Sequence, residues 1–565
     1  MSSAAAYLAV SFVILQLAEI LFPAFNLGPS SLRVLLGAEI ALFPVVLALS
    51  WVFDVTREGL IRTETGEGTK GPSKVITGGV LVSGLALGFV GWTAVQSLDP
   101  NAPGPAAPDA SIAVLPFADL SASGDQAYLG DGLAEEILNI LAGVDGLQVA
   151  ARTSSFSFRE NDDVRSIGDQ LGVATLLEGS IRRDDLNVRV TAQLIDTQTG
   201  FHLWSQNFDR ELNDLFAVQD EIAKAIAQAL LGELDIEGGP APQRYAASQE
   251  AQEAYWKGRA QWDRRFGGGI PEAVRFFTQA VELDSLYAQA YAGLADSWAL
   301  MPQFVASVDG DRALDRAEGF ALQAIQIDDD LAEPHASLGL IRALRGDRIE
   351  ALASLGRAID LNPSYAPALH WRANVLADMG RLADAEADAA RAIAVDPLSP
   401  AIATDYGYIL LWSGDLDGAR AQFDQAQANE FGFAPALFGA MQVAVAADQP
   451  VPLQMALTQW AAASSLPVSL ASGLATGMIM FRQTGDPQPV PPVLVGLARS
   501  GMLSAGTTAT LHALLGDTAG TVEWLEQSIE DRSWVDQYLL VNPVYDLVRG
   551  EPGFEAILNR ISGGA

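Results

Sequence analysis

The sequence has no cysteine among its 565 residues. Disulfide bonds, a thiolate nucleophile and cysteine-ligated metals are therefore excluded, whereas the cellular compartment is not settled by this absence. Histidine is scarce, and the four histidines lie scattered without metal-ligand spacing. Basic residues are also few: 34 Lys and Arg stand against 69 Asp and Glu, a formal net charge of −35. Such a surface repels phosphate backbones, so we expect no nucleic-acid partner.

The stretch from residue 331 to residue 431 repeats every 34 residues. Small residues recur in fixed columns, and two antiparallel helices cross closely only where side chains are small. A further apolar residue fills the slot between two of these columns, and proline, which does not continue a helix, closes two of the repeat units. The columns are Gly339, Ala373 and Gly407; Ala351, Ala385 and Ala419; Leu355, Ala389 and Phe423; Ala358, Ala392 and Ala426; with Pro363 and Pro397.

This period resembles the tetratricopeptide (TPR) repeat, which implies helical hairpins that stack into a solenoid and share a core. We assign TPR repeats to residues 247–431, with weaker matches before residue 331. Residues 432–565 are assigned to degenerate helical repeats and a C-terminal cap, because the period blurs and proline becomes frequent over 448–505.

The resemblance implies that an extended peptide or partner helix binds in a concave groove lined by the first helix of each hairpin. Side chains four residues apart share one face of a helix. The register therefore predicts that six side chains face this groove: His370, Asn374, Asp378, Thr404, Tyr408 and Trp412. Each of them taken alone is expected to be packing or solvated surface rather than a contact, but as a set they are the candidate peptide-binding site.

Three apolar runs precede the soluble part, at about 4–24, 32–53 and 75–95. Each is near the ~20 residues that a membrane-spanning helix needs. The loop between the second and third runs holds most of the nearby Lys and Arg, which predicts that residues 54–74 are cytoplasmic. The sequence thus predicts a bacterial inner-membrane, multi-pass protein whose C-terminal domains are periplasmic.

Two carboxylates lie within the predicted spans, Glu19 in the first and Glu39 in the second. Ionisable groups inside a membrane are candidates for function. The alternative is that both acids reach the interface or pair with Arg33 and fix the helical hairpin.

Residues 110–235 alternate strand-like and helix-like patterns, between linkers at 98–109 and 236–246. The motifs IAVLPFADLS, YLGDGLAEEI, LLEGSIRR and LIDTQTGFHLWSQNFDR resemble the amino-terminal domain of TolB and FlgO-type domains. This resemblance implies a small α/β module without catalytic residues. The acidic pair Glu135 and Glu136 is expected to be solvated, because adjacent side chains on a helix point apart.

The predicted fold class is multi-domain, with three transmembrane helices, a small TolB-like α/β domain and an all-α TPR solenoid. The predicted function is a non-enzymatic inner-membrane scaffold that binds protein or peptide partners, with no catalytic, cofactor-binding or metal-binding residues. The alternative is a membrane signalling component that transmits a state change through its transmembrane helices, with Glu19 and Glu39 taking part. A homo-oligomer is left open.

Overall fold

A computed structural model describes most of the chain from residue 110 onward and little before it. The described residues are 53–56, 59–62, 110–121, 127–144, 146–158, 162–184, 187–211, 221–222, 225, 247–264, 268–305, 308–530 and 539–562. The chain divides into two compact units, Met1–Pro105 and Ala106–Ala565. In the first unit, β1 (Phe53–Thr56) pairs antiparallel with β2 (Gly59–Arg62), and Phe53 lies opposite Arg62.

The predicted fold class needs correction. Within the described part of the chain, no helix is both long enough and apolar enough to cross a membrane. The longest described helix, α11 (Gly310–Ile327), has 18 residues and includes Asp311, Arg312 and Asp315. The described structure is a helical TPR-like solenoid with a small α/β region. The same finding contradicts the predicted multi-pass inner-membrane location. The predicted spans lie outside the described residues, apart from Phe53 in β1.

The α/β domain is built on one mixed sheet. Strand β3 (Ser111–Val114) lies between β5 (Gln148–Val149) and β6 (Thr175–Asp184), parallel to both. Antiparallel strands β7 (Asn187–Asp196) and β8 (His202–Glu211) then extend the sheet, in the order β5-β3-β6-β7-β8. The short strand β4 (Ala118–Asp119) also pairs with β6. The helices are α4 (Ala127–Ala142), α5 (Arg152–Ser155) and α6 (Val164–Leu171).

Successive side chains along a strand point to opposite faces of the sheet, so they belong to two separate buried clusters. On β3, Ile112 and Val114 pack with α4, whereas Ala113 packs with α6. This is the two-residue period of a strand with helices over both faces. Glycine allows the closest approach at β6, where a Cβ on Gly179 would lie 2.3 Å from the ring of Phe117.

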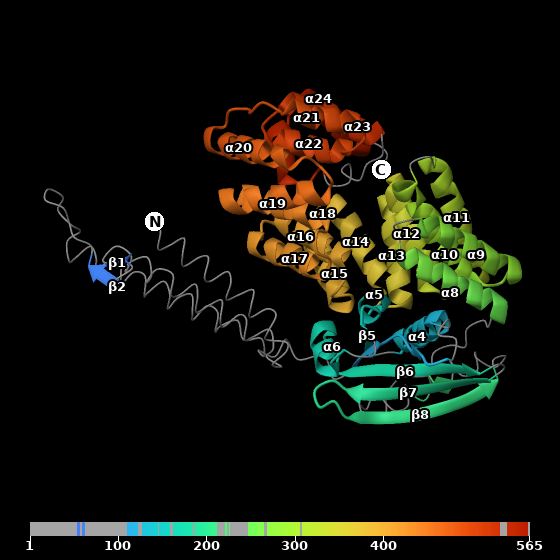
Figure 1. The fold of residues 1–565 in the computed structure, drawn as a ribbon. Helices are drawn as coiled ribbons and strands as arrows, with labels where there is room; N and C mark the ends of the chain where they lie inside the picture. The colour runs from blue at the N-terminus through green and yellow to red at the C-terminus, as the bar shows by residue number, and fades with distance from the viewer. Residues whose placement is uncertain are drawn as a thin grey trace, which may run out of the picture. The chain divides into compact units, whose positions relative to one another are not determined.

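The remaining helices form consecutive antiparallel hairpins that stack side by side (Figure 1). This arrangement confirms the predicted TPR array. The hairpin helices are α8 (Gln249–Arg264), α9 (Gly269–Leu283), α10 (Ala288–Phe304), α11, α12 (Ala332–Arg345), α13 (Arg348–Leu361), α14 (Ala366–Asp378), α15 (Leu382–Val395), α16 (Pro400–Ser413), α17 (Leu416–Asn429), α18 (Ala434–Ala446) and α19 (Pro450–Ala463).

The predicted small-residue columns lie where the helices cross. A Cβ on Gly339 would come within 2.5 Å of Leu355, and one on Gly407 within 2.8 Å of Phe423. Ala351 and Ala385 are completely buried. A second glycine column, absent from our sequence interpretation, turns the chain within each hairpin: Gly346, Gly380 and Gly414 have φ of 89°, 76° and 90°. Only glycine adopts this left-handed conformation without strain, so the column ends each first helix.

The C-terminal region continues as less regular helices around their own core. Trp460 and Leu474 belong to one buried cluster, and Tyr545 and Phe554 to the next. The elements are α20 (Val468–Thr484), α21 (Pro492–Arg499), α22 (Ala505–Leu514), α23 (Thr518–Glu530), the 3-10 helix η3 (Pro543–Val548) and α24 (Pro552–Ser562).

Candidate functional site

The first helices of successive hairpins contact one another more closely than the second helices do. Contacts join α10 to α12, α12 to α14, α14 to α16 and α16 to α18, whereas the corresponding second helices have no comparable contact. The array therefore curves with its first helices on the inner side. All six predicted groove residues lie on α14 and α16, and we call this set the inner strip: His370, Asn374, Asp378, Thr404, Tyr408 and Trp412.

A hydrogen-bonded network joins the two helices of the inner strip. Asp405 Oδ2 accepts a hydrogen bond of 2.8 Å from Asn374 Nδ2 and lies 2.7 Å from His370 Nε2. The Asp405 side chain keeps 36% of its surface exposed. This network holds α14 and α16 in register and leaves a carboxylate edge open to solvent.

Two aromatic rings continue the strip along α16. The rings of Tyr408 and Trp412 stack with centroids 5.7 Å apart, and Tyr408 also meets Phe423 edge-on at 5.2 Å. The Tyr408 hydroxyl donates to the Pro435 carbonyl at 3.2 Å. Tyr408 is therefore anchored to α17 of its own hairpin and to α18 of the next one, and Trp412 is half-buried and stacked on it.

Asp378 is buried, as Asn374 and Thr404 are, and it differs from the rest of the strip because it forms an ion pair with Arg348. Burial raises the pKa of the Asp378 carboxyl to about 6, although Arg348 opposes this shift. Its partner belongs to the second helix of the preceding hairpin, so Asp378 joins two repeats. We therefore assign Asp378 a structural contact in addition to its place in the strip.

Two inner-face groups have no hydrogen-bond partner within the described structure. They are Thr404 Oγ1 and Gln442 Oε1, and both side chains are more than nine-tenths buried. Gln442 lies 34 residues after Tyr408 and 68 after Asn374, at the same register position. The period could have identified Gln442, whereas Asp405, one residue off that register, gave no signal in the sequence.

Among the described residues, no group of three or more His, Cys, Asp or Glu could hold a metal ion. The predicted intramembrane residues Glu19, Arg33 and Glu39 lie outside the described residues.

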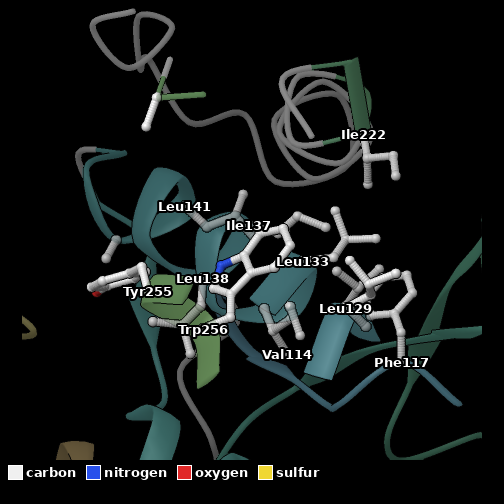
Figure 2. Packing of buried hydrophobic residues seen from close by; sticks show 14 of the residues in the cluster. Val114, Phe117, Leu129, Leu133, Ile137, Leu138, Leu141, Ile222, Tyr255 and Trp256 are labelled. Carbon is white, nitrogen blue, oxygen red and sulfur yellow. The ribbon is translucent and has the colours of Figure 1, made fainter. Parts of the chain in front are cut away.

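The first array helix completes the core of the α/β domain. Trp256 of α8 belongs to the same buried cluster as Val114, Leu133 and Leu138, which Figure 2 labels with it, and it is 3% exposed. It fits against α4 only because residue 132 is glycine, since a Cβ there would come within 2.2 Å of the indole. The α/β domain and the first repeat thus share one hydrophobic core.

The predicted solvation of Glu135 and Glu136 is wrong, because both side chains are buried against the array. Glu135 Oε1 accepts a hydrogen bond of 2.9 Å from Arg259 of α8. Glu135 Oε2 lies 2.9 Å from Nε of Arg152 in α5. A buried carboxylate requires such compensation, and the sequence alone did not reveal which arginines would supply it.

Residues 108–225 match the family model described as HilA/YgeH-like transcriptional regulator, second domain. A curated relative from Rhizobium meliloti (strain 1021), named putative adenylate cyclase 3, is 36% identical over 236 residues. The match covers 41% of this chain and 40% of that relative, so the chain spans well under half the length of that protein.

Solved structures similar to the array include PilW, a type IV pilus biogenesis factor, and PilF from Pseudomonas aeruginosa. The PilW match has 20% identity, covers 38% of this chain and 94% of that chain, and has a TM-score of 0.32. The PilF match has 17% identity, covers 38% of this chain and 91% of that chain, and has a TM-score of 0.31. YrrB, a TPR protein with an unusual peptide-binding site, has 20% identity, 33% and 90% coverage, and a TM-score of 0.24.

Proposed function

We propose that this chain is a non-enzymatic scaffold that binds a protein or peptide partner along the inner strip of its TPR array. The observation that carries the proposal is the repeated polar position on three neighbouring inner helices, Asn374, Tyr408 and Gln442. The buried oxygen of Gln442 lacks a partner within the described structure. A main-chain N–H from an extended segment would satisfy it, because buried polar groups in proteins are normally hydrogen-bonded.

The aromatic pair adds the second part of the argument. Tyrosine and tryptophan often supply binding hot spots, because they present large, rigid surfaces. Tyr408 and Trp412 are held in place by stacking, so little rotamer entropy remains to be lost on binding. The open edge of Asp405 favours a partner segment with a basic side chain, which also agrees with the net charge of −35.

The α/β domain is proposed to be a TolB-like module that forms part of the same scaffold. The four motifs named in the sequence analysis, which resemble TolB, support this proposal. We also propose the boundaries 110–235 for the α/β domain and 247–431 for the TPR repeats. The shared core around Trp256 supports a fixed junction between the two parts.

The experiment is a selection of ten-residue peptides from a displayed library on the full chain, followed by affinity measurements with variants. Asp405→Ala and Trp412→Ala are expected to weaken binding at least tenfold. Asp417→Ala is the matched control, because the Asp417 side chain on α17 is 97% exposed and lies outside the strip. Equal affinity of all variants, with unchanged circular dichroism, would refute the inner strip as the site.

A second candidate is a regulatory module, in which partner binding to the array changes the α/β domain. The match of residues 108–225 to a domain of transcriptional regulators favours this candidate. Hydrogen exchange with a selected peptide separates the two functions. A regulatory module shows altered exchange in α4 and α5 on binding, whereas a simple scaffold shows changes in the array alone.

A further inference from the structure

The α/β domain contacts the array at a second place, through α5. Here α5 lies against the turn between α15 and α16. The Ala151 N–H donates to the Val395 carbonyl at 2.9 Å. The Ser154 hydroxyl donates to Asp396 Oδ1 at 2.5 Å and accepts from the Leu398 N–H at 2.9 Å. The turn thus offers two acceptors and one donor to a single short segment.

Three other turns of the array show which hydrogen bond the C-cap side chain makes when no segment of the α/β domain contacts the turn. Each turn follows an outer helix whose C-cap is Asp or Asn, and that side chain accepts the N–H two residues later. The bonds are Leu286 N to Asp284 Oδ1 at 3.1 Å, Asp330 N to Asp328 Oδ1 at 3.1 Å, and Ser364 N to Asn362 Oδ1 at 3.0 Å. These closed turns are the usual Asx-type arrangement, in which the side chain satisfies its own backbone.

The turn after α15 is open instead. Asp396 is the C-cap of α15, so by register its carboxylate should accept from the Leu398 N–H. The Ser154 hydroxyl lies between these two groups and bonds to both. The Ser154 hydroxyl therefore lies where, in a closed turn, the Leu398 N–H would donate directly to the Asp396 carboxylate. Once Ser154 leaves, the turn can close as its three counterparts do.

The two contacts between the α/β domain and the array differ in chemistry. Around Trp256 the contact is mainly apolar and belongs to a shared core. At α5 it is mainly polar: besides the three hydrogen bonds above, Asp396 also accepts from the Thr153 side chain and the Ser154 backbone, and Ala151 and Leu398 supply the apolar contribution. The two contacts are separate in the structure, because the apolar one is made through α8 and the polar one through the α15–α16 turn.

We propose that the α15–α16 turn is a binding site for a short peptide segment that presents a serine or threonine hydroxyl and a main-chain N–H three residues earlier. In the resting chain α5 occupies this site in cis. A partner segment of the same chemistry displaces α5 and frees the α/β domain at that end.

The exchange of segments at the turn does not depend on the proposed binding of a partner at the inner strip.

The probe is a fluorescein-labelled peptide with the sequence of residues 148–158, measured by anisotropy on the full chain. We expect it to bind the Ser154→Ala chain at least tenfold more tightly than the wild-type chain, because the variant removes the hydroxyl that bonds to Asp396 and Leu398 and so weakens the hold of α5 on the turn. The control chain Ser157→Ala should behave as wild type, since the Ser157 hydroxyl donates only to the Thr153 carbonyl within the same segment. A peptide that itself carries Ser154→Ala should bind neither chain.

A second variant covers the case that Ser154→Ala destabilises the chain. Ala151 has φ of −63° and ψ of 150°, which proline adopts, so Ala151→Pro removes the N–H and keeps the backbone. It should also increase peptide binding at least fivefold. Failure of the peptide to bind either folded variant would overturn the proposal and leave α5 as a fixed domain contact. Library-selected peptides bound at Trp412, tested on the same chains, show separately whether the proposed function holds.

Discussion

The substitution Trp256→Ala tests whether the α/β domain depends on the first array helix for its stability. The indole is almost completely buried and packs against Gly132 of α4. A buried tryptophan removes about 200 Å² from water, and at ~25 cal/mol per Å² this contributes about 5 kcal/mol. Since the site can collapse in part, we expect a loss of about 3–5 kcal/mol in the free energy of unfolding.

The assay is urea denaturation of the full chain, combined with hydrogen exchange of α4. A loss of this size is a large part of the 5–15 kcal/mol that folded domains typically possess. Amides of α4 should therefore lose protection together with those of α8. Trp371→Ala is the control, because Trp371 packs between array helices and touches neither α4 nor the sheet clusters.

A loss below about 1 kcal/mol for Trp256→Ala, or full protection of α4 in that variant, would refute the shared core. Trp256→Phe should recover most of the stability, because it keeps an aromatic ring beside Gly132.

Three further predictions concern single positions. Ala385→Leu should lower the free energy of unfolding by about 1–3 kcal/mol, because Ala385 is completely buried at a helix crossing; an unchanged thermal midpoint would contradict the repeat register. Glu135→Gln should cost about 3 kcal/mol or more, since it leaves Arg152 and Arg259 without their buried carboxylate; equal urea midpoints would contradict this. The pKa of the Asp378 carboxyl is raised to about 6 in the fold from 3.8 for an unperturbed aspartate, which means that the folded chain holds this proton more tightly. Stability from this group is therefore greatest below pH ~4 and falls by about 3 kcal/mol as pH rises through ~6; Asp378→Asn should abolish that part of the pH dependence of the thermal midpoint.

The array could be predicted from the sequence because its physical requirement repeats. Every close crossing needs a small side chain, so Gly339 and Gly407 recur at the period of the hairpin. The inner-helix positions of Asn374 and Tyr408 follow from the same register. The contacts of these side chains could not be predicted from the register, because Asp405, which bonds to Asn374, belongs to the first helix of the next hairpin.

The contacts between the α/β domain and the array were not predictable for a related reason. Ser154 and Asp396 are 242 residues apart in the chain. Glu135 is likewise buried by Arg259, 124 residues away. Local patterns describe which face of a helix is apolar, but they carry no information about which distant segment covers it.

The membrane prediction rested on the length and apolar character of three runs. Those criteria are not met by any helix that the structure describes, and the fold class is corrected accordingly.

Photo-crosslinking from the inner strip tests the central claim most directly. A p-benzoylphenylalanine side chain is placed at position 405, at position 412 or at position 431 of the full chain in separate preparations. Phe431 is the control, because it is 93% exposed between hairpins and lies outside the inner strip. The account predicts a discrete protein adduct from positions 405 and 412 that a library-selected peptide competes away, and none from position 431. An adduct from position 431 alone, or equal adducts from all three positions that the peptide leaves unchanged, would contradict it.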